Sequence, residues 1–455
     1  MRSLHRVMLC AAAAAAALAL NARGDQLELL NGTRVQGQVV EETAEAVLMK
    51  VPAGSSAVRM RFSTARIHAI TVDGTRRVLN ERGAPSPGAP KPKAEEGGGD
   101  SAAPHATESA SPQQKTRSRD QVLALIQQAG STPPDWWDGV PLDYPKSLDL
   151  SWPEKAPGPW SPQKNVGQYL WSVINENPHK WRSGVRFLHY LLTVHKDNPK
   201  TLLRVMESLG NAYFNLLQDW ARAAFWWRKV DARDPLSVFD TVRLGQCYWR
   251  LGSKAMAAGQ LNMLEGYVST SMIKLWSDIG ELDKALSMAA SMARIGQRGE
   301  SDLIAEAHLA AGDALRLHGR YEDALDHYQK VLAVQPVGQR KGRIERCHKR
   351  AQANTEGIKV FDALDLKRIP NGTYTSSSVA YTGPLQVAVT VKDGRIESVK
   401  VTSHGDKQYY GAITETPAQI VEKQGVKGVD AVTCATMTSE AIINATAKAL
   451  AGGMK

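Results

Sequence analysis

Hydrophobic and polar residues alternate along residues 25–80 with the two-residue period of β-strands. The segment reads LELLNGTRVQGQVVEETAEAVLMKV and then AVRMRFSTARIHAITVDG, with turn signals at Asn31-Gly32 and Asp73-Gly74. Val, Ile and Thr fill the runs between these turns. The pattern predicts a small, strongly bent antiparallel β-sheet or barrel. Such modules usually mediate contacts, and no catalytic pattern is visible in this one.

The next two segments lack a regular period. Residues 81–118 are rich in Pro, Gly, Ala and Ser and nearly empty of large apolar residues, which predicts a flexible linker. Residues 119–163 begin with RDQVLALIQQA, a short predicted helix, and continue as a Trp/Pro-rich connector. This connector contains four tryptophans, Trp136, Trp137, Trp152 and Trp160. Two interpretations of them stay open: a surface on which a ligand stacks, and a clamp that holds the connector onto its neighbour. We favour the clamp.

From residue 164 to about 360 the pattern becomes helical and repeats. The clearest unit, at residues 305–336, reads AEAHLAAGDALRLHGRYEDALDHYQKVLAVQP. Gly312 and Ala324 are small where two helices would cross closely, and Pro336 ends the unit. Weaker copies carry the same kinds of residue at Gly210 and Trp227, Gly245 and Ala257, and Gly280 and Ala285.

These units resemble the tetratricopeptide repeat in their small, aromatic and proline positions. The resemblance implies an all-α solenoid whose concave face binds a peptide or protein partner. We therefore expect this region to serve in docking.

The last segment, residues 365–455, combines strands and helices. LQVAVTVKDGRIESVKV predicts a hairpin around Asp393-Gly394, TPAQIVEKQG a helix, and SEAIINATAKALAGG a terminal amphipathic helix. VDAVTCATMTSEAI lies immediately before and within the start of that last helix. A helix N-terminus offers free N–H groups and the positive end of the helix dipole, which favour an anion such as phosphate.

Short polar residues in this stretch suit such an anion. Thr433 and Thr436 add hydroxyls around it, and Ser439 or Thr438 can cap the helix. Ala435 lets the backbone approach the anion closely.

The segment from Gly372 to about Leu450 closely resembles the small FMN-binding domain of exported electron-transfer flavoproteins and redox-pump subunits. The strands match nearly throughout, and the family motif D-x-V-[ST]-G-A-T-x-T-S-x-A-I falls on residues 430–442. The resemblance implies FMN as cofactor, esterified through its phosphate to Thr436 by a flavin transferase that uses FAD. The residues that it implies for the cofactor site are Asp430, Thr433, Cys434, Ala435, Thr436, Thr438 and Ser439.

One departure from the family matters, because the motif glycine is Cys434 here. If that position needs a positive φ, a side chain costs on the order of 1 kcal/mol or more. Three outcomes stay open: covalent FMN, non-covalent FMN, and a degenerate domain without flavin. Two interpretations of the cysteine stay open: a thiol whose pKa is lowered by the nearby helix N-terminus, and a small tolerated replacement for glycine.

Composition and charge indicate the cellular location of the protein and the kinds of partner that it has. Residues 1–24 combine a basic start with an apolar run, which predicts a secretory signal peptide, with an uncleaved anchor as the alternative. The net charge of +10 forms no dense basic run, so we expect no nucleic-acid partner. Cys247, Cys347 and Cys434 offer neither a metal spacing nor a disulfide framework, and the eleven histidines form no metal motif.

The sequence therefore predicts a multidomain chain: an N-terminal β module, a tetratricopeptide solenoid and a C-terminal α+β FMN-binding domain. We expect an exported, periplasmic electron carrier that docks to redox partner proteins, including a membrane complex. No catalytic acid–base pair is visible, which favours a carrier over a substrate-specific enzyme. The alternatives are an interaction scaffold with a degenerate or non-covalent FMN domain and a flavin-dependent reductase.

Overall fold

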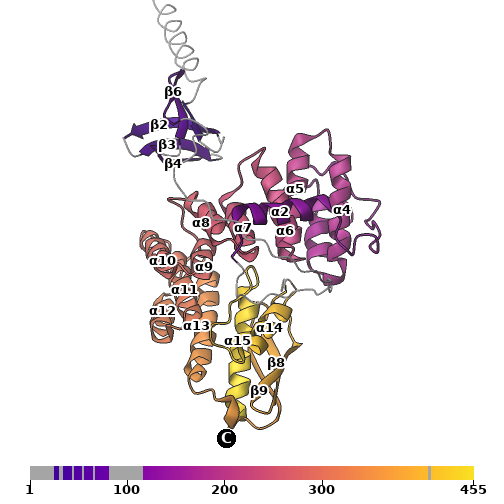
Figure 1. Ribbon diagram of the computed structural model, residues 1–455, viewed down its shortest axis with the longest axis vertical. Coiled ribbons are helices and arrows are strands. Elements are labelled where there is room, and N and C mark those ends of the chain that lie inside the picture. The colour runs from indigo at the N-terminus through magenta and orange to yellow at the C-terminus, as the bar shows by residue number, and fades with distance from the viewer. Residues whose placement is uncertain are drawn as a thin grey trace, which may run out of the picture. The chain divides into compact units, whose positions relative to one another are not determined.

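The computed structural model describes residues 25–29, 34–43, 46–53, 56–64, 67–80, 116–407 and 411–454 (Figure 1). The chain divides into two compact units, Met1–Ala106 and Thr107–Lys455, which we describe separately. The predicted signal peptide lies outside the described residues, and so do residues 81–115 of the predicted linker.

The first unit contains one antiparallel sheet, as the alternating pattern predicted. Its strand order is β4-β3-β2-β1-β5-β6, and buried residues on one side, including Leu27, Met49 and Ile70, form its core. Irregularities in register occur between Glu28 and Leu29 and between Val39 and Glu41; such bulges bend a sheet. The strands are β1 (Asp25–Leu29), β2 (Arg34–Glu42), β3 (Ala46–Ala53), β4 (Ser56–Ser63), β5 (Ile67–Val72) and β6 (Thr75–Val78).

The second unit begins with helix α2 (Arg119–Ser131), which a capping box between Ser118 and Gln121 starts. α2 packs against the helical region, with Gly130 directly beneath the ring of Phe225.

Three of the four connector tryptophans act as the predicted clamp. Trp136 packs against the helical core, the Arg186 guanidinium lies 4.4 Å from the Trp137 ring, and the Arg204 guanidinium lies 4.2 Å from the buried Trp152 ring. Trp160 is instead exposed.

The middle of the chain is a series of helical pairs joined by short turns (Figure 1). Short connections place successive helices side by side and antiparallel. The pattern thus matches the predicted repeats, while their assignment to the tetratricopeptide family stays a prediction. The helices are α3 (Val166–Tyr169), η2 (Leu170–Asn175), η3 (Pro178–Lys180), α4 (Trp181–Val194), α5 (Pro199–Asn215), α6 (Trp220–Asp231), α7 (Val238–Arg250), α8 (Lys254–Asn262), α9 (Thr270–Asp278), α10 (Leu282–Gly296), α11 (Ser301–Leu317), α12 (Tyr321–Ala333) and α13 (Lys341–Phe361).

The predicted small residues lie where paired helices cross. A Cβ atom added to Gly312 of α11 would lie 2.6 Å from the ring of Tyr328 on α12, and one added to Gly210 of α5 would lie 2.6 Å from Trp227 on α6. Contacts this close exclude any side chain. Each glycine therefore allows a large aromatic residue of the partner helix to be fully buried.

The C-terminal segment forms the predicted α+β domain. Its three-stranded antiparallel sheet has the order β7-β8-β9, and α15 packs against β7 and β8. The elements are η4 (Leu366–Arg368), β7 (Gly372–Val379), β8 (Pro384–Lys392), β9 (Arg395–Ser403), α14 (Ala412–Lys423) and α15 (Thr436–Gly453).

Helix α15 is buried on almost all sides because α13 covers the face that the sheet leaves open (Figure 1). Apolar residues of α11–α13 and of the C-terminal domain form one continuous hydrophobic core. At the crossing of α13 and α15, Gly357 makes room for Asn444, whose amide donates a hydrogen bond of 2.7 Å to Asn354. The helical region and the C-terminal domain are therefore packed as one body.

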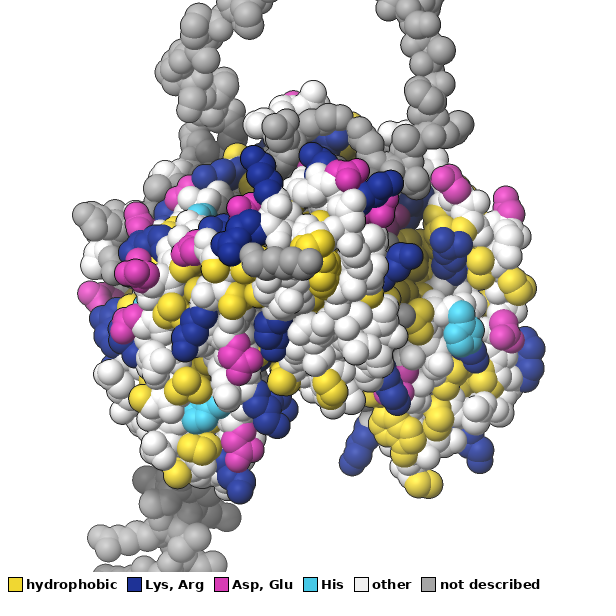
Figure 2. Space-filling view, turned by 90° about the horizontal axis from the view of Figure 1, so that it is seen from below, with side chains coloured by type: hydrophobic (Ala, Val, Ile, Leu, Met, Phe, Trp, Pro, Cys, Tyr) yellow, Lys and Arg dark blue, Asp and Glu magenta, His cyan; other side chains and the backbone are white. Residues whose placement is uncertain are grey.

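The surface mixes charges of both signs. On the face in Figure 2, Lys and Arg side chains lie among Asp and Glu side chains and scattered hydrophobic ones. Within the described ranges, no helix combines the length and apolar character needed to span a bilayer.

Candidate functional site

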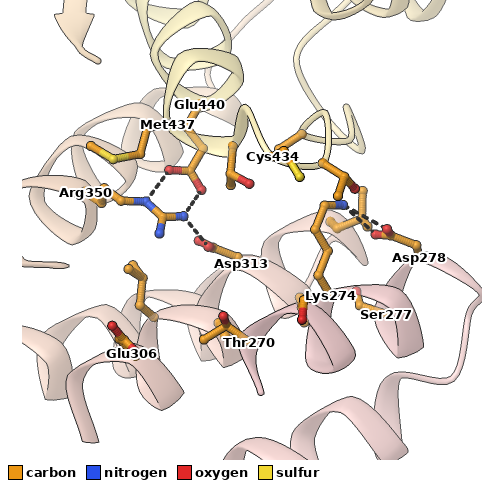
Figure 3. Close-up of a pocket in the computed structure, with 18 of the residues that line it drawn as sticks. Thr270, Lys274, Ser277, Asp278, Glu306, Asp313, Arg350, Cys434, Met437 and Glu440 are labelled. Atoms are coloured by element: carbon orange, nitrogen blue, oxygen red, sulfur yellow. Dashed lines mark hydrogen bonds and ion pairs between the residues drawn. The ribbon is translucent and has the colours of Figure 1, made fainter. Parts of the chain in front are cut away.

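A cavity of about 430 Å³ lies between the helical region and the C-terminal domain. One wall consists of residues 429–440, and the other comes from α7, α9, α11 and α13. Figure 3 shows Cys434, Met437 and Glu440 on the first wall, facing Asp313 and Lys274 on the second. The volume falls within the range of about 300–1,000 Å³ typical of cofactor and small-molecule sites.

The turn before α15 requires an unusual backbone conformation. Cys434 has a φ of 65°, in the left-handed region that favours glycine. This explains why the family motif has glycine here, and it confirms that a side chain at this position is strained. A left-handed conformation costs a non-glycine residue roughly 1–2 kcal/mol.

The capping prediction was wrong. Helix α15 begins after Ala435, whose side chain cannot cap, and the first hydrogen bond is donated by the Ser439 N–H to the Ala435 carbonyl at 3.0 Å. The N–H groups of Thr436, Met437 and Thr438 precede that bond and point out of the helix end. An uncapped N-terminus beside a cavity is suited to an anionic ligand.

The hydroxyls of the motif separate into two groups. Thr438 is buried and donates a 2.6 Å hydrogen bond to Asp406, and the buried Ser439 accepts one of 3.0 Å from the Val432 N–H. These two side chains hold the turn and are not among the cavity-lining residues, in contrast to Thr433 and Thr436. Thr436 is half-buried, and no hydrogen bond to its hydroxyl occurs within the described residues.

Asp430 is engaged by the helical region. Its carboxylate accepts a 2.8 Å hydrogen bond from Lys274 of α9, which also bonds both carboxylate oxygens of Asp278, at 2.8 and 2.9 Å (Figure 3). Burial would raise the pKa of Asp430, but Lys274 and Arg250 hold it below its usual value. Burial and the Asp430 charge raise the pKa of Asp278, the more buried carboxyl, to about 7.

A second ion cluster joins α15 to α11 and α13. Arg350 donates to both oxygens of Glu440, at 2.9 and 2.8 Å, and to Asp313 at 2.8 Å (Figure 3). Burial would raise the pKa of Glu440, but Arg350 lowers it below the usual value, whereas burial and the Glu440 charge raise the pKa of Asp313 to about 6. The two carboxyls share one guanidinium, and Glu440, which receives two bonds, is the one that stays ionised.

Arg243 of α7 extends toward the strained turn. Its Nη2 atom lies 4.0 Å from Cys434 Sγ, and its guanidinium is held by Asn211, by Asp240 at 3.6 Å and by the face of Phe239, 3.8 Å from the ring centroid.

The thiol does not have the lowered pKa that the sequence predicted. Cys434 is accessible from the cavity but surrounded by protein, and this desolvation raises its pKa despite Arg243. Cys247, Cys347 and Cys434 are all free thiols.

Several buried polar atoms beside the cavity have no hydrogen-bond partner among the described residues. They belong to both walls: Thr433 Oγ1, Arg243 Nε, Ser277 Oγ and Arg316 Nε. An unsatisfied buried group costs about 1–3 kcal/mol. These four atoms are inaccessible to solvent, so they lie behind the surface of the cavity and do not face a ligand there.

The residues fit FMN on these grounds. Free N–H groups at the start of α15 suit a phosphate, and the cavity is of cofactor size. Across the described ranges, no group of three or more His, Cys, Asp or Glu side chains is placed to bind a metal ion.

An α+β domain with an open helix N-terminus at a cofactor-sized cavity is an arrangement suited to binding a cofactor. Residues 380–451 match the family of the FMN-binding domain, which supports the predicted FMN binding and a flavoprotein. Over 82 residues the chain is also 43% identical to an uncharacterized protein of Treponema pallidum (strain Nichols). That match covers 18% of this chain and 22% of the other protein, so the chain spans about a fifth of this relative's length.

Sequence reasoning missed the wall that the helical region provides. Arg243, Lys274 and Arg350 are far from the motif in the chain, and no pattern links them to it. One signal was available, because Glu440 and Asn444 flank the apolar run Ala441-Ile442-Ile443 in the terminal helix. Polar residues on a buried helix require partners, and these two find Arg350 and Asn354.

Proposed function

We propose that this chain is a flavoprotein electron carrier in which FMN is esterified to Thr436. The observation that carries the proposal is the position of Thr436. It lines the cavity at the first turn of α15, whereas Thr438 and Ser439 are buried in hydrogen bonds of their own. Thr433 also lines the cavity, but its Oγ1 atom is inaccessible to solvent. Thr436 is therefore the hydroxyl of this motif best placed to react.

Attachment requires a transferase and FAD. The Thr436 oxygen attacks the phosphorus on the riboflavin side of the FAD pyrophosphate. A phosphoester bond forms to Thr436, the P–O–P bond breaks, AMP leaves, and the hydroxyl proton passes to a base of the transferase or to solvent. The remaining phosphate oxygens would lie at the N-terminus of α15, where the free N–H groups favour negative charge.

Bound FMN supplies reversible one- and two-electron transfer through its isoalloxazine ring. The protein's part is to orient the ring and set its electrostatic surroundings. Each carboxylate of the cavity has an ion-pair partner: Asp278 and Asp430 with Lys274, Asp313 and Glu440 with Arg350, and Glu306 with Arg343. These ion pairs fix the charges that surround the ring.

The proposal also includes the location of the carrier and its partners. The basic and apolar pattern of residues 1–24 supports export to the periplasm. The helical pairs offer an extended surface for docking a redox partner protein or a membrane complex. Electrons would then pass between protein partners.

Co-expression with a flavin transferase tests the proposal. The unsubstituted protein should show a fluorescent band on a denaturing gel and an intact mass increased by FMN less one water. Thr436→Ala should abolish both, while Thr414→Ala, which removes an exposed threonine of the same domain outside the motif, should retain them. A label that persists in Thr436→Ala means another attachment residue.

Further outcomes discriminate between the alternatives. If the protein carries neither covalently attached nor non-covalently bound flavin, it acts as an interaction scaffold. Turnover with a soluble donor and acceptor alone, without protein partners, would instead identify a reductase.

A further inference from the structure

We propose that the helical region completes the flavin site, with Arg243 and Phe239 of α7 as residues that contact the cofactor. This inference rests on the proposed function and assigns to α7 a part of the site that the FMN-binding segment, residues 380–451, does not contain.

Arg243 is held in place before any ligand binds. Asn211 of α5, Asp240 and the ring of Phe239 fix its guanidinium from three sides. A side chain fixed in this way loses little further rotamer freedom on binding a ligand. Its Nη2 atom lies 4.0 Å from Cys434 Sγ, which places a positive charge beside the turn that leads into Thr436. Arg243 can therefore reach an anionic or carbonyl oxygen of a cofactor attached there.

Phe239 has the exposure expected of a ligand contact. Its side chain is 51% exposed although it lines the cavity. Arg243 covers one face of the ring, at 3.8 Å from the centroid. A single exposed aromatic residue is ordinary on a protein surface, but this one lies on a cavity wall beside a fixed cation. Such a pair suits a flat aromatic ring that also carries polar atoms.

A functional consequence follows from the charge of Arg243. A reduced flavin carries more negative charge than an oxidised one, so a nearby cation favours the reduced form and raises the midpoint potential. In this arrangement the helices do more than dock the carrier, because α7 also sets the potential of its cofactor.

The test compares Arg243→Gln, Arg243→Lys and Phe239→Leu in the full chain after flavin transfer. The control is Lys254→Gln at the start of the next helix, α8, because Lys254 pairs with Glu281 at 2.7 Å on the surface and does not line the cavity. Flavin content comes from intact mass, ring exposure from iodide quenching of flavin fluorescence, and potential from a redox titration.

Arg243→Gln should shift the potential to a more negative value, Arg243→Lys should restore part of the shift, and Phe239→Leu should increase quenching. Lys254→Gln should match the unsubstituted protein in all three measurements. Flavin present in every variant with unchanged potential and quenching overturns this inference alone. Absence of flavin from the unsubstituted protein overturns the proposed function, and this inference with it. Phe239→Leu provides an independent result if Arg243→Gln does not fold.

Discussion

The two walls of the cavity are built from different kinds of residue. Residues 429–440 contribute small hydroxyls, a strained turn and the open end of a helix, whereas α7, α9, α11 and α13 contribute long charged side chains. Local chain conformation positions the first wall. Tertiary packing and ion pairs position the second, as with Lys274 on Asp430 and Arg350 on Glu440. The comparison teaches that a compact binding motif can depend on distant helices for its final geometry.

The largest effect on stability is expected from Arg350→Met. Removing the guanidinium leaves Glu440 with only Arg316, at 3.9 Å, and leaves Asp313 with two neutral hydrogen-bond donors, Tyr328 and Asn354; this loss should cost about 3–5 kcal/mol. Thermal melting followed by circular dichroism would show the loss. Lys448→Met is the control, because its pair with Glu356 joins the same two helices at the surface and should change stability by less than about 1 kcal/mol. Equal effects of the two variants would mean that the buried cluster does not hold the walls together.

The next effect concerns pH and Asp278. Its folded pKa of about 7 lies above the ordinary value of 3.8, so its contribution to stability is complete below pH 4 and is lost as pH rises through 7. At about 1.4 kcal/mol per pK unit, this loss is on the order of a few kcal/mol. Asp278→Asn cannot ionise, so its melting temperature should fall less between pH 5 and pH 8.5 than that of the unsubstituted protein.

The control for this pH series is Asp323→Asn, which removes an exposed carboxylate of the same helical region. Its melting temperature should follow that of the unsubstituted protein at every pH. Parallel curves for all three proteins would show that Asp278 is not the titrating group.

The smallest effect is expected in the first wall. Cys434→Gly should stabilise the protein by about 1–2 kcal/mol, because glycine adopts a φ of 65° without strain. It should also speed flavin transfer, since it restores the family motif. Cys434→Ala is the control, because it removes the thiol but keeps the strained Cβ. A gain in Cys434→Ala as large as in Cys434→Gly would assign the effect to the thiol instead of the backbone.

Prediction from the sequence succeeded for the features that local backbone conformation and local packing determine. Alternation predicted the strands of the N-terminal sheet, and glycines such as Gly312 marked the helix crossings. The family glycine at position 434 correctly indicated a positive φ. These features depend on local sterics, which a short stretch of sequence records.

Prediction failed where distant segments meet. The capping role predicted for Thr438 or Ser439 was wrong, because the Thr438 hydroxyl donates its hydrogen bond to Asp406 and the Ser439 hydroxyl accepts one from the Val432 N–H. The interpretation of Cys434 as a thiol with a lowered pKa was also wrong, because desolvation by burial outweighs Arg243. The partners in both cases are set by the tertiary fold, and a single sequence does not show them.

Helix α15 also has a consequence for the order in which the chain assembles. It docks onto α13 and supplies the partners of Arg350 and Asn354, yet it follows α13 in the chain by an entire sheet and another helix. Before α15 docks, Gly357 and Arg350 of α13 lack Asn444 and Glu440, the α15 side chains that contact them in the folded protein. Resistance of α13 to a protease during refolding would therefore report when α15 has docked onto it.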